Sequence, residues 1–126
     1  MLEILCSVEL WDEENPLISA DAIRGYVDLI VLSLVRTKPS YAYELARSIS
    51  IVTGADYTMK QATLYSAVKR FELSGLVTSY PGTSESGKPR TYYQITASGR
   101  AHLNLKVKEW RDTKSVIDRF AEGINS

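Results

Sequence analysis

The clearest periodic pattern of apolar residues in the chain lies between residues 60 and 75. Positions i, i+4, i+7 and i+11 of this stretch hold Leu64, Val68, Phe71 and Gly75. This spacing places the four residues on one face of a helix. The glycine then ends the helix, because it can adopt the positive φ that helix C-termini favour. The pattern therefore predicts an amphipathic helix with one buried face.

Two short β-rich segments follow this helix. Leu76 and Val77 begin the first, and residues 91–95 form the second. Between them lies a polar loop, residues 81–90, with two glycines, two prolines and the cations Lys88 and Arg90. A helix followed by a two-stranded ribbon with a basic tip is the arrangement of a winged helix, which places the helix in a DNA major groove. We expect an α+β fold, mainly α: a winged helix-turn-helix with a long C-terminal helix.

Each of the first three predicted helices has a polar residue that is expected to cap it. Ser19 precedes a helix over residues 20–35, whose interior is apolar nearly all round and is therefore expected to be buried on more than one side. Ser40 is the expected cap of a second helix over residues 41–52. Thr58 is the expected cap of the third helix, the one with the apolar stripe.

The last part of the chain is predicted to form one long helix over residues 97–123, capped by Thr96. A heptad-like seam runs along it through Leu103, Val107, Trp110, Lys114, Ile117, Ala121 and Ile124. Because this helix has more apolar face than so small a domain needs, we expect a homodimer. The dimer contact is assigned to Leu103, Val107, Trp110, Ile117 and Ile124. The alternative is a helix that packs only on its own domain.

These elements divide the chain into three parts. We expect an acidic N-terminal extension (1–19), a winged-helix DNA-binding domain (20–96) and a C-terminal dimerisation helix (97–126). The extension is the hardest part to interpret, with several apolar residues before a turn at Asn15-Pro16. It fits equally an added arm that covers the dimer or a ligand site, and a partly ordered extension.

The formal net charge is zero, which at first argues against a nucleic-acid partner. The charges are segregated, however. Residues 1–28 hold seven acids and one arginine, net −6; residues 29–100 hold nine bases and four acids, net +5; residues 101–126 hold five bases and four acids, net +1. The middle is therefore a basic module behind an acidic leader. Chance segregation on a solvated surface is the alternative, because a DNA footprint needs basic residues gathered on one face.

Residue types that carry catalysis are scarce. The single cysteine, Cys6, and the single histidine, His102, cannot form a disulfide or a zinc set, and no catalytic Cys/His pair is plausible. Residues 82–88 superficially match a phosphate-binding loop, but Pro89 replaces the required Ser or Thr and a strand follows. No apolar run approaches ~18 residues and the N-terminus lacks a basic region. We expect a cytoplasmic protein that is not an enzyme and uses no cofactor or metal.

The side of the third helix away from its apolar stripe suits a DNA groove. It is predicted to carry Met59, Ala62, Thr63, Ser66, Lys69, Arg70 and Leu73. The small members permit close approach, the hydroxyls can donate or accept hydrogen bonds, and the cations can reach phosphates. Lys60 and Gln61 lie at the helix N-terminus, where recognition helices meet base edges and free N–H groups favour a phosphate.

In the wing, Lys88 and Arg90 are expected to neutralise DNA backbone charge, a contact with steep salt dependence. Tyr92 and Tyr93 are neighbours on a strand, so one must face the core and the other must face outward.

Four motifs follow one another in the chain: Tyr41-Ala-Tyr43-Glu44-Leu45, Ala62-Thr63-Leu64-Tyr65, Lys69-Arg70-Phe71-Glu72-x-x-Gly75-Leu76-Val77 and Gly87-Lys88-Pro89-Arg90-Thr91-Tyr92-Tyr93-x-Ile95-Thr96-x-x-Gly99. In order and spacing they resemble the PadR family of transcriptional regulators, over residues 23–124. The chain departs from the family at Tyr41-Ala42, where His-Gly is frequent. Residues 1–19 lie outside the resemblance.

The resemblance implies a winged-helix domain, a dimer through the C-terminal helix and repression by operator binding. The chain is similar to the short PadR-like subfamily with multidrug-sensing repressors of the LmrR type. Those place a tryptophan of the last helix in a dimer-interface pore, where it stacks planar drugs. Trp110 has the similar place here, so the resemblance implies a planar aromatic effector bound at this residue. A tryptophan that only packs in the interface is the alternative.

The leading hypothesis is a homodimeric repressor whose third helices enter major grooves of a two-fold symmetric, double-stranded DNA operator. A ligand would release it only by binding one conformational state better than the other. The alternative hypothesis is a winged-helix adaptor that binds protein and no nucleic acid, which the zero net charge and the acidic leader favour.

Overall fold

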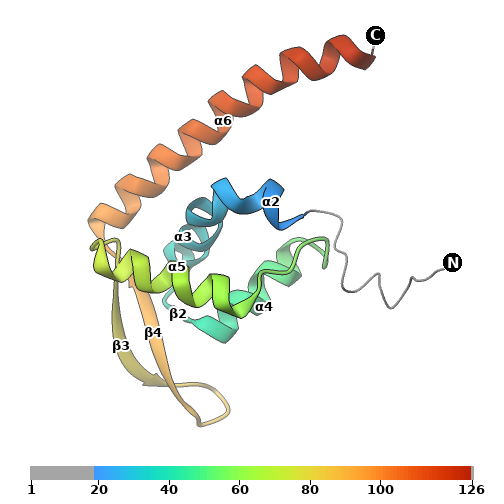
Figure 1. The fold of residues 1–126 in the computed structure, drawn as a ribbon. Coiled ribbons are helices and arrows are strands. Elements are labelled where there is room, and N and C mark those ends of the chain that lie inside the picture. Colours follow the sequence, from blue (N-terminus) through green and yellow to red (C-terminus); the bar gives the residue numbers. More distant parts are fainter. Residues whose placement is uncertain (1–18, 126) are drawn as a thin grey trace, which may run out of the picture.

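The computed structural model of the chain describes residues 19–125. Its elements are α2 (Ala20–Ile23), the 3-10 helix η1 (Arg24–Tyr26), α3 (Val27–Thr37), β2 (Ser40–Tyr41), α4 (Ala42–Val52), α5 (Gln61–Leu73), β3 (Val77–Thr83), β4 (Pro89–Ile95) and α6 (Ala97–Asn125). A body of helices packs on a small antiparallel sheet, and the hairpin β3–β4 and the far end of α6 project from it (Figure 1). This is the expected winged helix. Of the predicted N-terminal extension, everything before Ser19 lies outside the described residues, with Cys6, Trp11 and the Asn15-Pro16 turn.

The wing is longer and its loop shorter than the sequence predicts. The strands β3 and β4 pair antiparallel from Val77 opposite Ile95 to Thr83 opposite Pro89, which leaves only residues 84–88 as the loop. The predicted loop, residues 81–90, is therefore too long. Proline is tolerated in this ladder because Pro81 lies on an edge strand and Pro89 is the first residue of its strand.

The first predicted helix, over residues 20–35, is interrupted. Ser19 caps α2 as expected, since its Oγ accepts a hydrogen bond from the backbone N–H of Ala22 at 3.1 Å. The chain then tightens into η1, and Tyr26 leaves the helical region with φ −117° and ψ 9° before α3 begins. Gly25, in the middle of η1, is a poor helix former, which explains why the helix yields there.

The predicted cap of the second helix is wrong. Ser40 belongs to β2, where it pairs with Tyr93, and its Oγ donates a hydrogen bond to the carbonyl oxygen of Lys38 at 3.1 Å. The helix α4 begins two residues later, and its capping position is held by Tyr41 without a side-chain bond. The sheet partner, 53 residues further along the chain, therefore outweighs the local capping preference of serine.

The start of α5, the predicted third helix, also differs from the prediction, and its end does not. Thr58 lies before the helix and does not cap it; the capping position is Lys60, with no side-chain hydrogen bond to the first turn. At the other end Gly75 has φ 77°, its N–H bonds Glu72 O at 3.1 Å, and the N–H of Leu76 bonds Phe71 O at 2.8 Å. These two bonds form a Schellman motif, which confirms that Gly75 ends the helix.

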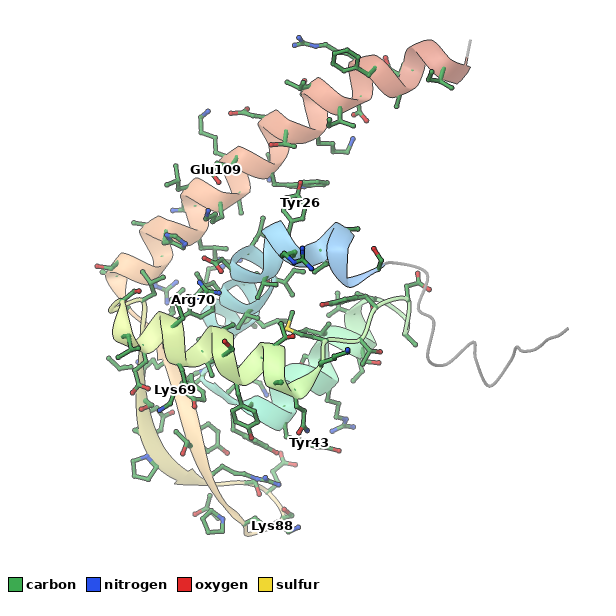
Figure 2. The ribbon with its side chains drawn as sticks, viewed as in Figure 1. Tyr26, Tyr43, Lys69, Arg70, Lys88 and Glu109 are labelled. Atoms are coloured by element: carbon green, nitrogen blue, oxygen red, sulfur yellow. The ribbon has the colours of Figure 1, made fainter. Side chains whose placement is uncertain are left out.

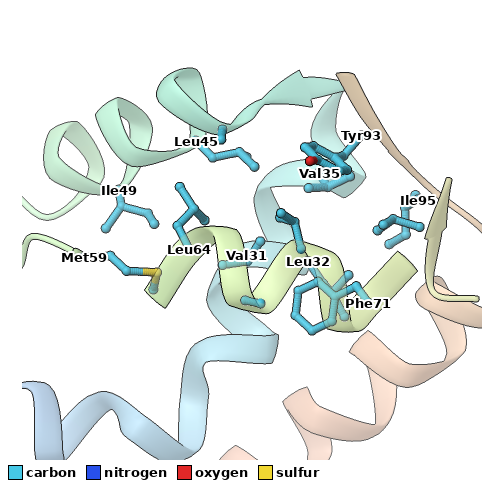
Figure 3. Packing of buried hydrophobic residues seen from close by; sticks show 14 of the residues in the cluster. Val31, Leu32, Val35, Leu45, Ile49, Met59, Leu64, Phe71, Tyr93 and Ile95 are labelled. Atoms are coloured by element: carbon cyan, nitrogen blue, oxygen red, sulfur yellow. The ribbon is translucent and has the colours of Figure 1, made fainter. Parts of the chain in front are cut away.

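The hydrophobic core lies between α3, α4 and α5, with the base of the wing at one side (Figure 3). The predicted stripe of α5 is confirmed, because Leu64, Val68 and Phe71 are all 1 % exposed or less. Met59 is 2 % exposed and packs in this core, so its assignment to the DNA-facing side is wrong. The α5 stripe meets Val31, Leu32 and Val35 of α3, Leu45 and Ile49 of α4, and Tyr93 and Ile95 of β4.

The last helix is anchored at its beginning and leaves the body at its end. Thr96 caps it as predicted: its Oγ1 accepts from the N–H of Gly99 at 3.0 Å and lies 2.7 Å from the carbonyl oxygen of Gly75. Leu103 is buried and Val107 half-buried, both in the core of the same chain. The second half of α6 extends past the other helices (Figure 1).

Candidate nucleic-acid interface

The outer face of α5 is exposed, and no side chain caps the N-terminus of this helix. Lys60, Gln61, Thr63 and Ser66 are exposed, as the sequence predicts. No side chain bonds the first-turn N–H groups, and the first turn contains no acidic residue. Backbone donors at a free helix N-terminus bind phosphate oxygens well. This end of α5 can therefore offer N–H groups, an amide, hydroxyls and one ammonium group to a DNA groove.

The two adjacent cations of α5, predicted to act together, point to different sides of the helix (Figure 2). The side chain of Lys69 is 71 % exposed, and its ammonium lies 3.9 Å from the carboxylate of Glu72, a weak ion pair. The guanidinium of Arg70 lies 3.1 Å from Asp28 of α3 and packs over the ring of Phe71. Lys69 is therefore free to meet a phosphate, whereas Arg70 is already bound to its own protein.

Asp28 also contacts the last helix. Its second carboxylate oxygen lies 3.1 Å from Nε2 of His102. The sequence alone assigned no site to His102 or to Asp28. No local signal could have identified this cluster, because Asp28, Arg70 and His102 are far apart in the sequence.

At the wing tip the loop is held by its own backbone. The N–H of Ser84 bonds the carbonyl oxygen of Lys88 at 2.9 Å, and the N–H of Gly87 bonds Ser84 O at 2.8 Å. Gly87 takes φ 86°, a conformation that glycine adopts without strain. Lys88 is exposed at the end of the hairpin (Figure 2). This turn presents a single ammonium group well beyond the helical body.

Arg90 is placed differently from Lys88, although the sequence analysis paired the two. It lies within β4, opposite Gly82 of β3. Its guanidinium carbon is 4.9 Å from the ring centroid of Tyr41 and 6.0 Å from that of Tyr43. The arginine therefore packs between the wing and the start of α4 and is not part of the tip.

The strand tyrosines face opposite sides, as predicted. Tyr93 is buried in the core, and desolvation by burial raises its pKa above the ordinary value of 10.0, with smaller contributions from Glu72 and Tyr65. Tyr92 is half-buried on the other side of the sheet. Two further tyrosines, Tyr43 and Tyr65, are about half exposed near the interface, and the sequence analysis assigned them no DNA contact.

Trp110 lies beside a hollow in the protein surface. Its ring meets that of Tyr26 edge-on, with centroids 5.2 Å apart and an interplanar angle of 78°. An apolar hollow of about 340 Å³ adjoins the pair and is lined by Ala22, Ile23, Tyr26, Leu29, Ile30 and Trp110. Sequence reasoning identified the tryptophan but not Tyr26, which lies 84 residues earlier and meets it only through the packing of η1 on α6.

Two classes of site are missing from the part of the chain that the structure describes. No group of histidine, cysteine, aspartate and glutamate side chains within residues 19–125 could hold a metal ion. None of the described helices is long and apolar enough to cross a membrane.

The chain resembles a family of transcriptional regulators in both sequence and fold. The transcriptional regulator PadR-like family matches residues 31–105. A transcriptional regulator from Clostridium thermocellum is 48 % identical with a TM-score of 0.74, covering 79 % of this chain and 97 % of its own. A PadR family transcription regulator from Clostridium difficile is 34 % identical with a TM-score of 0.65, covering 76 % and 98 %. An uncharacterized protein from Lysinibacillus sphaericus is 40 % identical over 108 residues, 86 % of this chain and 99 % of that protein. The chain therefore belongs to the PadR-like family of transcriptional regulators and is a DNA-binding regulator with a winged-helix fold.

Proposed function

We propose that this regulator is a homodimeric repressor. Two copies pair through the α6 helices, each α5 enters a major groove of a two-fold symmetric operator, and each wing touches the flanking backbone. A planar aromatic ligand at the dimer interface releases the complex by favouring a different spacing of the two α5 helices. Residues 20–96 act as the DNA-binding part and residues 97–126 as the dimerisation helix.

The dimer is proposed because of an exposed apolar face on the second half of α6, which extends past the other helices. Ile117, Phe120 and Ile124 are 58 %, 73 % and 83 % exposed, although they recur at the spacing of one helix face. A contiguous apolar stripe of this kind marks an interaction surface. Leu103 and Val107, also assigned to the dimer contact, pack on α3 of their own chain. The proposed contact therefore begins near Trp110 and continues to Ile124.

Sedimentation equilibrium tests the dimer. The wild type should have twice the chain mass of 14.1 kDa, and Phe120→Glu should have the mass of one chain. Ser115→Glu is the matched control, because it adds the same charge to an exposed polar position nearby and should leave the dimer intact. A monomeric wild type, or a dimeric Phe120→Glu, contradicts the proposed interface.

Gel shifts on the chain's own promoter test the DNA-binding face. Lys69→Ala should weaken binding and make the negative slope of log K against log salt shallower by about 0.9, the value for one lost phosphate contact. Lys108→Ala is the control, because the Lys108 side chain is 74 % exposed, close to the 71 % of Lys69, but lies on α6. Equal binding by both variants excludes the assigned face. No duplex binding by the wild type favours the protein-binding adaptor.

In vitro transcription tests the sign of regulation. Added protein should reduce the transcript from a promoter that it binds in the gel shift, and Lys69→Ala should reduce it less. An increase in transcript identifies an activator and excludes repression.

The ligand part of the proposal rests on the hollow beside Trp110. Its volume of about 340 Å³ lies in the range of small-molecule sites, and its lining is apolar with two aromatic rings. Aromatic faces bind flat ligands at low entropic cost. Fluorescence titration with a planar cationic dye tests this in a Trp11→Phe background, where Trp110 is the one remaining tryptophan of the chain's two.

Quenching of Trp110 by the dye, together with release of promoter DNA, is the expected result. Trp110→Leu removes the fluorophore, so its dye binding is followed by anisotropy of the dye and should be weaker. Unchanged dye affinity in Trp110→Leu contradicts a stacking role for this residue.

A further inference from the structure

Arg90 is held by aromatic rings at the point where the wing leaves the helical body. Its guanidinium lies over Tyr41 of β2 and near Tyr43 in the first turn of α4. Its Nε is buried and has no hydrogen-bond partner. Removing this N–H from water without a partner costs free energy, which cation–π contacts with the two rings offset. The Arg90 side chain is therefore partly buried against the two rings, unlike the exposed side chain of Lys88.

The same aromatic cluster joins both strands of the wing to the rest of the protein. The ring of Tyr92 meets Tyr41 edge-on at 5.3 Å between centroids and stacks on Tyr80 at 5.7 Å with an interplanar angle of 15°. Its hydroxyl donates a hydrogen bond to the carbonyl oxygen of Thr83 at 3.3 Å. Contacts thus run from β3 through β4 to β2.

The backbone of the wing is adapted to this cluster at Gly82. A Cβ at that position would lie 2.6 Å from two ring atoms of Tyr92, closer than real side chains allow. The absence of a side chain lets the tyrosine ring lie across β3. Gly82 also pairs with Arg90 in the ladder, so the glycine, the ring and the guanidinium form one unit.

We propose that Arg90 is a positioning residue of the wing. It holds the hairpin against the start of α4, so that Lys88 at the tip, and not Arg90, meets the DNA backbone. A two-stranded hairpin is only marginally stable by itself, so its angle to the body must come from such side contacts. The inference uses only the DNA binding of the chain and is independent of its proposed dimer, ligand and sign of regulation.

Salt dependence separates positioning from a phosphate contact. A residue that neutralises a phosphate contributes about 0.9 to the slope of log K against log salt. A residue that only keeps the wing in its binding-competent position changes the affinity through the competent fraction and leaves the slope unchanged. Both quantities come from fluorescence anisotropy with a random-sequence duplex and with the chain's own promoter, over a series of salt concentrations.

Four variants complete the experiment. Lys88→Ala should make the negative slope shallower by about 0.9. Arg90→Ala and Arg90→Lys should both weaken binding by about two- to fivefold, the worth of an exposed cation–π contact, at unchanged slope. Lysine keeps the charge but lacks the planar group that spans two rings, so it should not rescue. Gly82→Ala should behave like the Arg90 variants, because it displaces Tyr92 without changing any charge.

Two results overturn the proposal. In the first, the negative slope of log K against log salt becomes as shallow in Arg90→Ala as in Lys88→Ala, and Arg90→Lys restores it. That result identifies a phosphate contact by Arg90. The other is wild-type affinity in both Arg90 variants. Thermal unfolding of each variant accompanies the titrations, which are run where every variant is folded. If the second result comes with a lowered unfolding temperature, Arg90 has a merely structural role.

Discussion

Asp28 lies where α3, α5 and α6 meet, and its two carboxylate oxygens contact Arg70 and His102, each at 3.1 Å. The Asp28 side chain is 20 % exposed and the Arg70 side chain 54 % exposed, so their ion pair is partly screened by water. Such a pair is weak, so the guanidinium of Arg70 can leave Asp28 and bind another anion. A DNA phosphate near this flank of α5 therefore competes with Asp28 for the same guanidinium.

Asp28→Asn should release Arg70 for DNA. Binding to a random-sequence duplex should tighten, and the slope of log K against log salt should steepen by about 0.9. The double variant Asp28→Asn/Arg70→Met should have the same slope as Arg70→Met alone, because the released group is then absent. Anisotropy titrations measure all of these. Weaker binding by Asp28→Asn at intact folding contradicts the competition and shows that the carboxylate prepares Arg70 for its contact.

The residues assigned to the DNA-facing side of α5 were not all predicted equally well from the sequence. Helical periodicity alone placed Thr63, Ser66 and Lys69 on the exposed side, because α5 follows the period of 3.6 and its buried stripe is clear. The same reasoning failed for Met59, which precedes the helix and turns into the core. It gave no account of the partners of Arg70, since a pair 42 residues apart has no local signature.

Among the predicted helix boundaries, the one that depends on backbone conformation was correct. Those that depend on a capping side chain were correct less often. Gly75 ends α5 as predicted, because a positive φ is a requirement that few residues meet. Ser40 and Thr58 do not cap their helices. A serine can bond many backbone groups at similar cost, so the packing of the strand or loop that contains it decides which one it bonds.

The docking of α6 on the wing base provides a test at this scale. A Cβ at Gly99 would collide with the carbonyl oxygen of Leu76 and lie 2.7 Å from Cγ1 of Ile95. Gly99→Ala should therefore reduce the free energy of unfolding by about 1–3 kcal/mol, the cost of overpacking. Urea unfolding measures the change.

Gly123→Ala is the control within the same helix, because a Cβ there meets nothing within 4 Å. Alanine is the better helix former, so this variant should gain up to about 1 kcal/mol. A Gly99→Ala variant as stable as the wild type shows that α6 can dock without the close approach to Leu76.

For the whole molecule, buried tyrosines set the alkaline limit of stability. Burial raises the pKa of Tyr57 and Tyr93 above 10.0, so the folded state resists ionisation that the unfolded chain allows. Their contribution is complete below the unfolded pKa and is lost as pH rises through the folded pKa. The free energy of unfolding should therefore fall above about pH 10.

Urea titrations at increasing pH measure this fall. Tyr93→Phe removes one ionising hydroxyl and should flatten the pH dependence relative to the wild type. An equally steep fall in Tyr93→Phe places the alkaline sensitivity in other groups.

The part of α6 beyond Trp110 is long, so a small tilt of this helix moves its far end by several ångströms. Fourteen residues separate Trp110 from Ile124, a span of about 21 Å at the rise of an α-helix. In the proposed dimer, a tilt of about 10° at the Tyr26–Trp110 contact displaces the far end by about 4 Å over that span. Hydrogen bonds to bases tolerate only a few tenths of an ångström. If the proposed ligand rotates the Trp110 ring in the proposed dimer, the two α5 helices should move by more than this tolerance and lose their match to the spacing of the two major grooves.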